Sequence, residues 1–121
     1  MRVSYEYLGF IDKDEMHIEK IGESSFIILP PQYGMFYILP GITLNINLEC
    51  KFCKATREVE NEATLMVGNG TIMGTIECSL CNSYSLIMFH KKTIMKLIDE
   101  MRINPNLIKE HWGYASSLSN N

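Results

Sequence analysis

The chain has 121 residues, of which 46% are hydrophobic and 21% charged, and its formal net charge is -3. This size and balance predict one globular domain with a modest core. The negative charge argues against a dedicated nucleic-acid-binding protein, because such proteins normally carry a basic face. No apolar run reaches the roughly 18 residues of a membrane span, and the N-terminus lacks the pattern of a signal peptide, so we expect no membrane partner.

The N-terminal part of the chain is predicted to form β-strands. Residues 16–21 fit either a short strand or a single helical turn. Pro40 and Gly41 are expected to end a strand with a turn. Apolar and polar residues then alternate from 42 to 49, which predicts a half-buried strand that leads directly to Cys50. Aromatic and β-branched residues predict three further strands, over 3–11, 25–29 and 35–39.

The second half is predicted to continue as strands and to end in two helices. Gly68-Asn69-Gly70 forms a turn, because its residues tolerate positive φ. Asn104 and Pro105 supply the N-cap and first position of the second helix, and Gly113 is its expected stop. Short strands are expected over 57–60, 63–67, 71–77 and 83–89. Apolar residues recur at helical spacing in both helices, at Ile94, Leu97, Ile98 and Met101 and then at Leu107, Ile108, Trp112 and Ala115.

All four cysteines lie in two Cys-x-x-Cys pairs, Cys50 with Cys53 and Cys78 with Cys81, separated by 24 residues. Thiolates with two residues between them allow one tight turn to direct both sulfurs at a single ion, and two such turns supply a tetrahedral zinc site. The alternatives are two redox dithiols or two disulfides. A thioredoxin-type dithiol needs a helix directly after the pair, and neither pair precedes one. We therefore expect these four cysteines to bind Zn²⁺.

A zinc ion held by four protein thiolates has no open position for water, so this site is expected to be structural rather than catalytic. Its binding contributes on the order of 10–16 kcal/mol at neutral pH, which is comparable to the roughly 5–15 kcal/mol stability of a whole domain. Iron in a rubredoxin-like site uses similar spacing, and four sulfurs alone do not exclude it. Four thiols committed to metal fit a reducing compartment, so we expect a cytoplasmic location.

The remaining residues offer no recognisable catalytic arrangement. The three histidines, His17, His90 and His111, are isolated in sequence. His90 follows a strand that leaves the second cysteine pair, and it could therefore lie near the metal. No nucleotide-binding or hydrolase motif is present, and no cysteine remains as a nucleophile. The sequence therefore predicts that the protein is not an enzyme.

The stretch from Pro40 to Asn82 resembles a zinc-ribbon segment of eukaryotic multidomain proteins that carry ubiquitin-like repeats. Ser79 stands where that family reads proline, and Ile72 and Met73 depart from its Gly-x-Gly-x-Phe-Asp pattern. The small size and the Ile-, Asn-, Lys- and Met-rich usage are also similar to translocated effectors of the Legionella kind, one of which inhibits ubiquitin-deamidating effectors. The pieces that match the zinc-ribbon segment are Pro40-Gly41-Ile42, Cys50-x-x-Cys53, Val59, Gly68-Asn69-Gly70-Thr71 and Cys78-x-x-Cys81.

These observations together predict an α+β fold, an antiparallel sheet that contains a zinc ribbon over about 42–90 with a C-terminal helical hairpin over about 92–115. Residues 1–115 are expected to form one domain and 116–121 a flexible tail. We expect a non-catalytic module that binds another protein, as an adaptor or inhibitor, in the cytoplasm or, for an effector, in the host cytosol. Spare apolar helix surface suggests a homodimer. The alternative is a nucleic-acid-binding ribbon with a basic face made by Lys51, Lys54, Arg57, Lys91 and Lys92.

Overall fold

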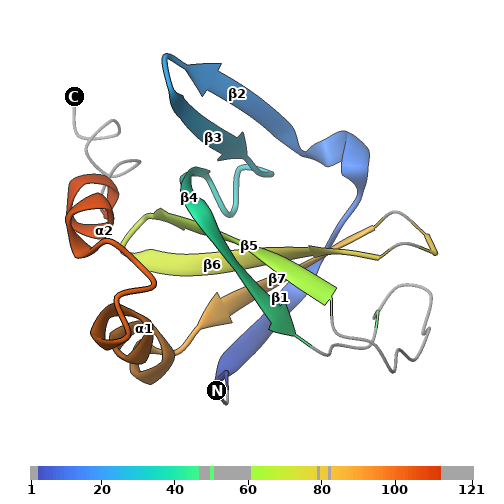
Figure 1. The fold of residues 1–121 in the computed structure, drawn as a ribbon. Helices are drawn as coiled ribbons and strands as arrows, with labels where there is room; N and C mark the ends of the chain where they lie inside the picture. The colour runs from blue at the N-terminus through green and yellow to red at the C-terminus, as the bar shows by residue number, and fades with distance from the viewer. Residues whose placement is uncertain (1–2, 47–49, 51–60, 79, 82, 113–121) are drawn as a thin grey trace.

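The structure is a computed structural model that describes residues 3–46, 50, 61–78, 80–81 and 83–112. It is mostly an antiparallel sheet with two short helices, which agrees with the predicted α+β class (Figure 1). The strand order is β1-β7-β6-β5-β4-β3-β2. No helix among the described residues is both long and apolar enough to span a bilayer. The elements are β1 (Tyr5–Ile11), the 3₁₀ turn η1 (Lys13–Glu15), β2 (His17–Ile21), β3 (Ser24–Ile28), β4 (Met35–Ile46), β5 (Asn61–Gly68), β6 (Thr71–Glu77), β7 (Tyr84–Phe89), α1 (Lys91–Asp99) and α2 (Pro105–His111).

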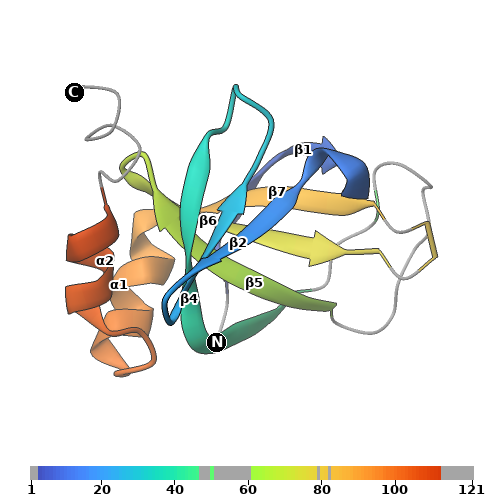
Figure 2. The ribbon, with the colours of Figure 1, turned by 90° about the horizontal axis from the view of Figure 1, so that it is seen from above.

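The two edge strands of this sheet, β1 and β2, are consecutive in the chain. Residues 12–16 alone connect them, and they span at most about 22 Å even when fully extended. In a flat seven-stranded sheet the two edges would lie about 29 Å apart, because neighbouring strands are about 4.8 Å apart. The sheet must therefore curl, and the β2–β3 hairpin stands away from the β5–β6–β7 layer (Figures 1 and 2). Of residues 16–21, for which the sequence left two alternatives, residues 17–21 form strand β2.

Strand β4 corrects the prediction that Pro40 and Gly41 end a strand with a turn. The strand continues through both residues, and its register against β5 shifts there, so that residues 39–42 lie opposite residue 65 alone. Proline is tolerated within a sheet at such a bulge, and Gly41 takes the φ of +71° that the bend requires. The bulge keeps the chain in the sheet instead of reversing it.

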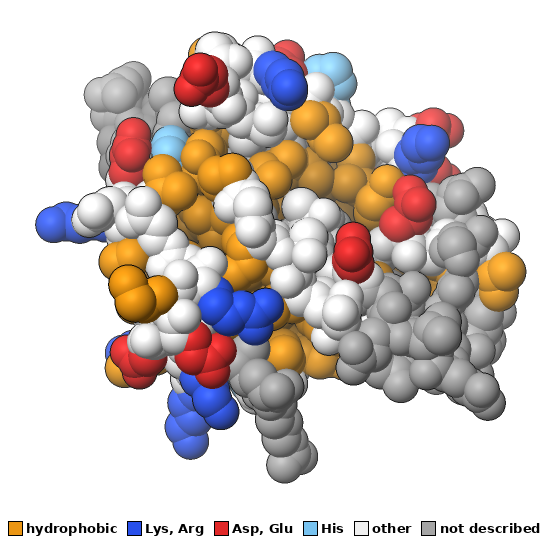
Figure 3. Space-filling view, viewed as in Figure 1, with side chains coloured by type: hydrophobic (Ala, Val, Ile, Leu, Met, Phe, Trp, Pro, Cys, Tyr) orange, Lys and Arg blue, Asp and Glu red, His pale blue; other side chains and the backbone are white. Residues whose placement is uncertain are grey.

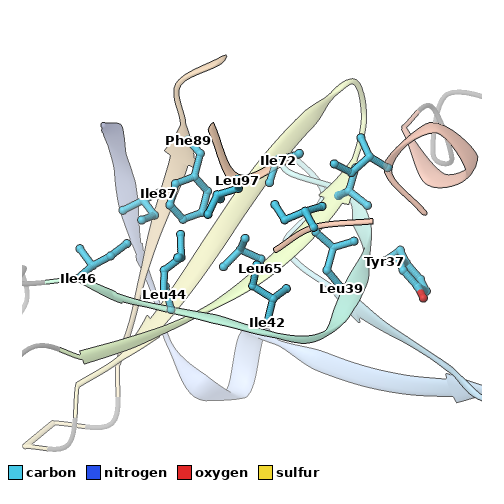
Figure 4. Close-up of a cluster of buried hydrophobic side chains, with 14 of the residues drawn as sticks. Tyr37, Leu39, Ile42, Leu44, Ile46, Leu65, Ile72, Ile87, Phe89 and Leu97 are labelled. Atoms are coloured by element: carbon cyan, nitrogen blue, oxygen red, sulfur yellow. The ribbon is translucent and has the colours of Figure 1, made fainter. Parts of the chain in front are cut away.

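The same bulge changes which side chains of β4 face the core. Tyr37 and Leu39 precede it at odd positions, whereas the inward residues after it are at even positions, and all of them belong to one buried cluster (Figure 4). In a regular strand of this sequence the two halves of β4 would present opposite faces, because side chains alternate along a strand. The predicted alternation after Gly41 is confirmed as far as the structure describes it, by Ile42, Leu44 and Ile46.

The central strands are buried on both faces. Leu65 and Val67 of β5 face the cluster that contains the helices, while Met66 between them faces a second cluster on the other side of the sheet. Met66 and Met73 are 0% and 3% exposed, so these methionines fill the core. Figure 3 shows hydrophobic side chains gathered below the β2–β3 hairpin, with charged side chains mostly around them.

The two helices pack at one end of the sheet (Figure 2). Leu97 of α1 and Ile108 of α2 enter the main buried cluster. The predicted start of α2 is confirmed, because the Asn104 side chain accepts a hydrogen bond of 2.9 Å from the Asn106 N–H and Pro105 is the first helical residue. At the other end of α2, the carbonyl of Trp112 accepts a 2.7 Å hydrogen bond from the Gly70 N–H of the β5–β6 turn.

Met101 was predicted to face the core with the apolar stripe of α1, and this prediction is wrong. Its side chain is 90% exposed, and its φ is +59°. The Met101 N–H donates to the Ile98 carbonyl and the Arg102 N–H to the Leu97 carbonyl, both at 2.9 Å. This is the Schellman arrangement that ends many helices, and its left-handed residue is normally glycine. Helix α1 therefore ends two residues before Met101, which the stripe alone does not reveal.

Several predicted features lie outside the described residues. They are Leu48, the strand over 57–60, Cys53, Gly113, Ala115 and the tail over 116–121.

Candidate metal centre

Three of the four predicted zinc ligands come together in the structure. The Sγ atoms of Cys50, Cys78 and Cys81 all lie within 4.8 Å of one another. The Sγ atoms of Cys50 and Cys81 are 3.6 Å apart. Cys53, the fourth predicted ligand, lies outside the described residues. The two cysteine pairs, which are far apart in the sequence, thus contribute to one cluster.

The antiparallel order of the sheet explains why these cysteines meet. β4 and β6 both pair with β5 in antiparallel fashion, so they run in the same direction and end at the same end of the sheet. Cys50 follows β4 at a distance of four residues, and Cys78 directly follows β6. Cys81 lies in the turn that returns the chain into β7, and the Cys78 N–H donates to the Ser83 carbonyl across that turn at 2.8 Å.

A cross-strand pair stabilises the base of this turn. Glu77 at the end of β6 lies opposite Tyr84 at the start of β7, and the Tyr84 hydroxyl donates to Glu77 Oε2 at 2.7 Å. This hydrogen bond to the carboxylate raises the pKa of Tyr84, and partial burial adds to the effect. The contact holds β6 and β7 together at the base of the turn that contains Cys78 and Cys81.

The sulfur separations fit a shared metal ion rather than a disulfide. In a tetrahedral site with Zn–S bonds of about 2.3 Å, two sulfurs lie about 3.8 Å apart. A disulfide would require about 2.05 Å, so the 3.6 Å between Cys50 Sγ and Cys81 Sγ excludes a disulfide between these two residues. The donor set also fits zinc, because thiolates are soft ligands that zinc and iron–sulfur centres share. The three described thiols could therefore hold a metal ion.

The environment of the cluster is partly buried. Cys50 and Cys78 are 4% and 5% exposed, and Cys81 is half-buried. Hydrogen bonds from the side chain and the backbone of Ser83 lower the pKa of the Cys81 thiol, and Ser83 is itself buried. The thiolate is the form that binds metal, so these hydrogen bonds favour the ligating state. Burial raises the pKa of Tyr7, and the negative charge of a Cys50 thiolate adds to that shift.

None of the three histidines belongs to this cluster, which contains cysteines alone among the described residues. His90 lies at the far end of β7, beside Ser4, whose Oγ is 2.6 Å from His90 Nδ1. His17 is on the edge strand β2, with its Nε2 3.4 Å from Glu19 Oε1. His111 is stacked on the Tyr37 ring, with the two centroids 3.7 Å apart.

One residue near the cluster was not singled out by the sequence. Leu80, between Cys78 and Cys81, is 71% exposed, although leucine is normally buried. The Cys-x-x-Cys spacing could have identified Leu80 as exposed, because the middle residues of such a turn point away from the ion that the cysteines share. The predicted basic residues Lys91 and Lys92 instead begin α1, at the opposite end of β7 from the cysteines.

Neither protein-family models, nor curated proteins, nor solved structures gave a match to this chain. The case for the site therefore rests on its own geometry and chemistry.

Proposed function

We propose that this protein is a non-catalytic, zinc-stabilised module that binds another protein as an adaptor or inhibitor. The convergence of the Cys50, Cys78 and Cys81 thiols carries the proposal. Cys53 would complete the tetrahedral set, since it belongs to the same pair as Cys50. With four thiolates bound, the ion has no position for water or substrate, so its role is structural.

The bound ion would stabilise the end of the sheet where β4, β6 and β7 come together. Its positive charge would neutralise the thiolates, and its bonds to sulfur would take the place of apolar packing at that end. A site of this kind contributes on the order of 10–16 kcal/mol, which is comparable to the stability of a whole domain of about 5–15 kcal/mol. The metal would therefore fix the position of the turn that contains Leu80.

Leu80 supports the protein-binding part of this proposal. A large apolar side chain that is 71% exposed on a turn fixed by metal is a suitable anchor for a partner protein. A rigid anchor loses little conformational freedom when it binds, which favours affinity. We infer that the partner contacts this turn with an apolar pocket that receives Leu80.

A nucleic-acid-binding ribbon remains the alternative. Two of its five basic residues, Lys91 and Lys92, lie at the opposite end of β7 from the cysteines, so they do not extend a basic surface around the metal site. Binding of this type would weaken steeply as salt is added, because counterions are released from the nucleic acid. Absence of binding to single- or double-stranded probes at low salt would dismiss it.

Metal analysis of the purified chain tests the site directly. We expect equimolar zinc, and a cobalt-substituted protein with the absorption of a tetrahedral thiolate site. Cys50→Ser and Cys78→Ser should each lose the metal, whereas Leu80→Ser should retain it, because that side chain faces solvent. A wild-type chain without stoichiometric metal would refute the proposal.

The protein-binding role requires a second experiment. Partners captured from cells by the zinc-loaded wild-type chain are compared with those captured by Leu80→Ser. The matched control is Met95→Ser, which removes another exposed apolar side chain, 53% exposed, from α1. A partner lost with Leu80→Ser and retained with Met95→Ser supports the proposed surface. Equal capture by both variants excludes Leu80 as the anchor.

A further inference from the structure

The edge strand β2 is the most exposed strand of the described chain. It is the last strand in the sheet order and pairs only with β3 among the described strands. All five of its residues are exposed, and two are apolar, Ile18 at 60% and Ile21 at 58%. The outer backbone edge of such a strand presents N–H and C=O groups that another strand can bind.

A row of apolar side chains ends at this edge. Ile18 of β2 lies opposite Ile27 of β3, and Ile27 lies opposite Phe36 of β4. Ile27 and Phe36 are 2% and 1% exposed within the second buried cluster, whereas Ile18 is 60% exposed. We call these three residues the edge row. On the other face, Glu19 lies opposite the buried Phe26 and ends the corresponding row with a charge. The core thus continues to the sheet edge on one face only.

We propose that β2 is a dimerisation strand, which pairs in antiparallel fashion with β2 of a second copy of this chain about a two-fold axis at Ile18. Two neighbouring antiparallel strands of identical copies are related by a two-fold axis perpendicular to the sheet. The strands then keep their faces, and residues opposite each other share a face, so the axis must pass at one residue that lies opposite its own copy. The possible registers are therefore few.

Charge distinguishes these registers. Centring the axis on Glu19 places two carboxylates opposite each other, and centring it on Lys20 places two ammonium groups opposite each other, which is destabilising in both cases. Centring the axis on His17 places Glu15 opposite Glu19 of the second copy. Centring it on Ile21 places Glu19 opposite Glu23 of the second copy. The register centred on Ile18 instead places Ile18 against its own copy and His17 against Glu19 of the second copy.

The Ile18 register also completes the edge row. It joins the exposed ends of the two rows, so that Ile18 from each copy covers the other, and apolar cross-strand pairs of this kind are favourable. His17 and Glu19 already approach each other within one chain, with 3.4 Å between Nε2 and Oε1. The pairing would also place His17 of each copy opposite Glu19 of the other copy, on either side of the two-fold axis. The cysteine cluster belongs to other strands, so this proposal is independent of the metal site.

Sedimentation equilibrium on the purified chain tests the pairing. We expect a concentration-dependent dimer. Ile18→Lys places two ammonium groups opposite each other at the axis and should weaken the dimer at least tenfold. Ile21→Lys is the matched control, because it is on the same strand with nearly equal exposure but lies beyond the paired segment. It should change the dissociation constant by less than twofold.

A charge exchange tests the register itself. His17→Glu places a carboxylate opposite Glu19 of the second copy, and Glu19→Lys places an ammonium group opposite His17, so each should weaken the dimer. The double variant restores opposite charges and should recover most of the affinity. A chain that stays monomeric at millimolar concentration overturns the proposal, including the case in which β2 binds a strand of a different protein. Equal effects of Ile18→Lys and Ile21→Lys also overturn it.

Discussion

The left-handed backbone conformation of Met101 leads to a prediction about the free energy of unfolding that the sequence alone would not suggest. Replacing Met101 with glycine should stabilise the protein. An L-residue in this conformation costs about 1–2 kcal/mol, and glycine removes that cost. The side chain is 90% exposed, so its removal sacrifices almost no buried area.

The gain is partly offset, because glycine loses more backbone freedom on folding than methionine does. That difference is roughly 0.5–1 kcal/mol, which leaves a net stabilisation of about 0.5–1 kcal/mol. For a chain of this length, such a change raises Tm by about 2–5 °C. Thermal unfolding followed by circular dichroism, with the metal content of both proteins matched, measures this difference.

Met95→Gly is the control for the Met101 prediction. Met95 is also exposed, at 53%, but it lies inside α1. Glycine in a helix interior should destabilise the protein by about 1 kcal/mol. Opposite signs for the two variants are therefore expected. If Met101→Gly lowers Tm as Met95→Gly does, the reasoning about the end of α1 is wrong.

Three further outcomes follow from the structure. A strong chelator should lower Tm by tens of degrees or abolish the cooperative unfolding transition. The reason is that the free energy of metal binding, about 10–16 kcal/mol, is comparable to the stability of the fold. An unchanged transition would count against a structural metal. Gly74→Ala should destabilise the protein by about 1–3 kcal/mol in urea unfolding, because the new Cβ would lie 2.9 Å from the ring of Phe89. Phe89→Leu should reduce that penalty. If the effects of Gly74→Ala and Phe89→Leu on the free energy of unfolding are additive, the clash is contradicted. Gly41→Ala should cost about 1 kcal/mol through its φ of +71° alone, since nothing lies within 4 Å of the new Cβ, and a neutral result would argue against the bulge geometry of β4.

Local patterns in the sequence determined most of the elements and the candidate ligands. The alternation after Gly41 predicts the second half of β4, because one face of that strand is buried and the other is wet. The Asn104-Pro105 pair predicts the start of α2, because capping and a fixed φ depend only on neighbouring residues. The Gly68-Asn69-Gly70 turn and strand β6 follow in the same way, with Asn69 at a φ of +51°. The cysteine spacing predicted that the two pairs would meet, and three of the four thiols do come together.

Only the tertiary structure decided the features that depend on long-range pairing. Pro40 and Gly41 carry a local turn signal, yet pairing of both halves of β4 with β5 converts it into a bulge. Residues 17–21 become a strand because β3 is available to pair with them, which no local pattern reveals. Met101 continues a helical stripe in sequence, but the chain must leave α1 before it to reach α2, so the side chain points into solvent. The meeting of Cys50 with Cys78 and Cys81 likewise results from the parallel direction of β4 and β6 across β5, a relation that exists only once the sheet has formed.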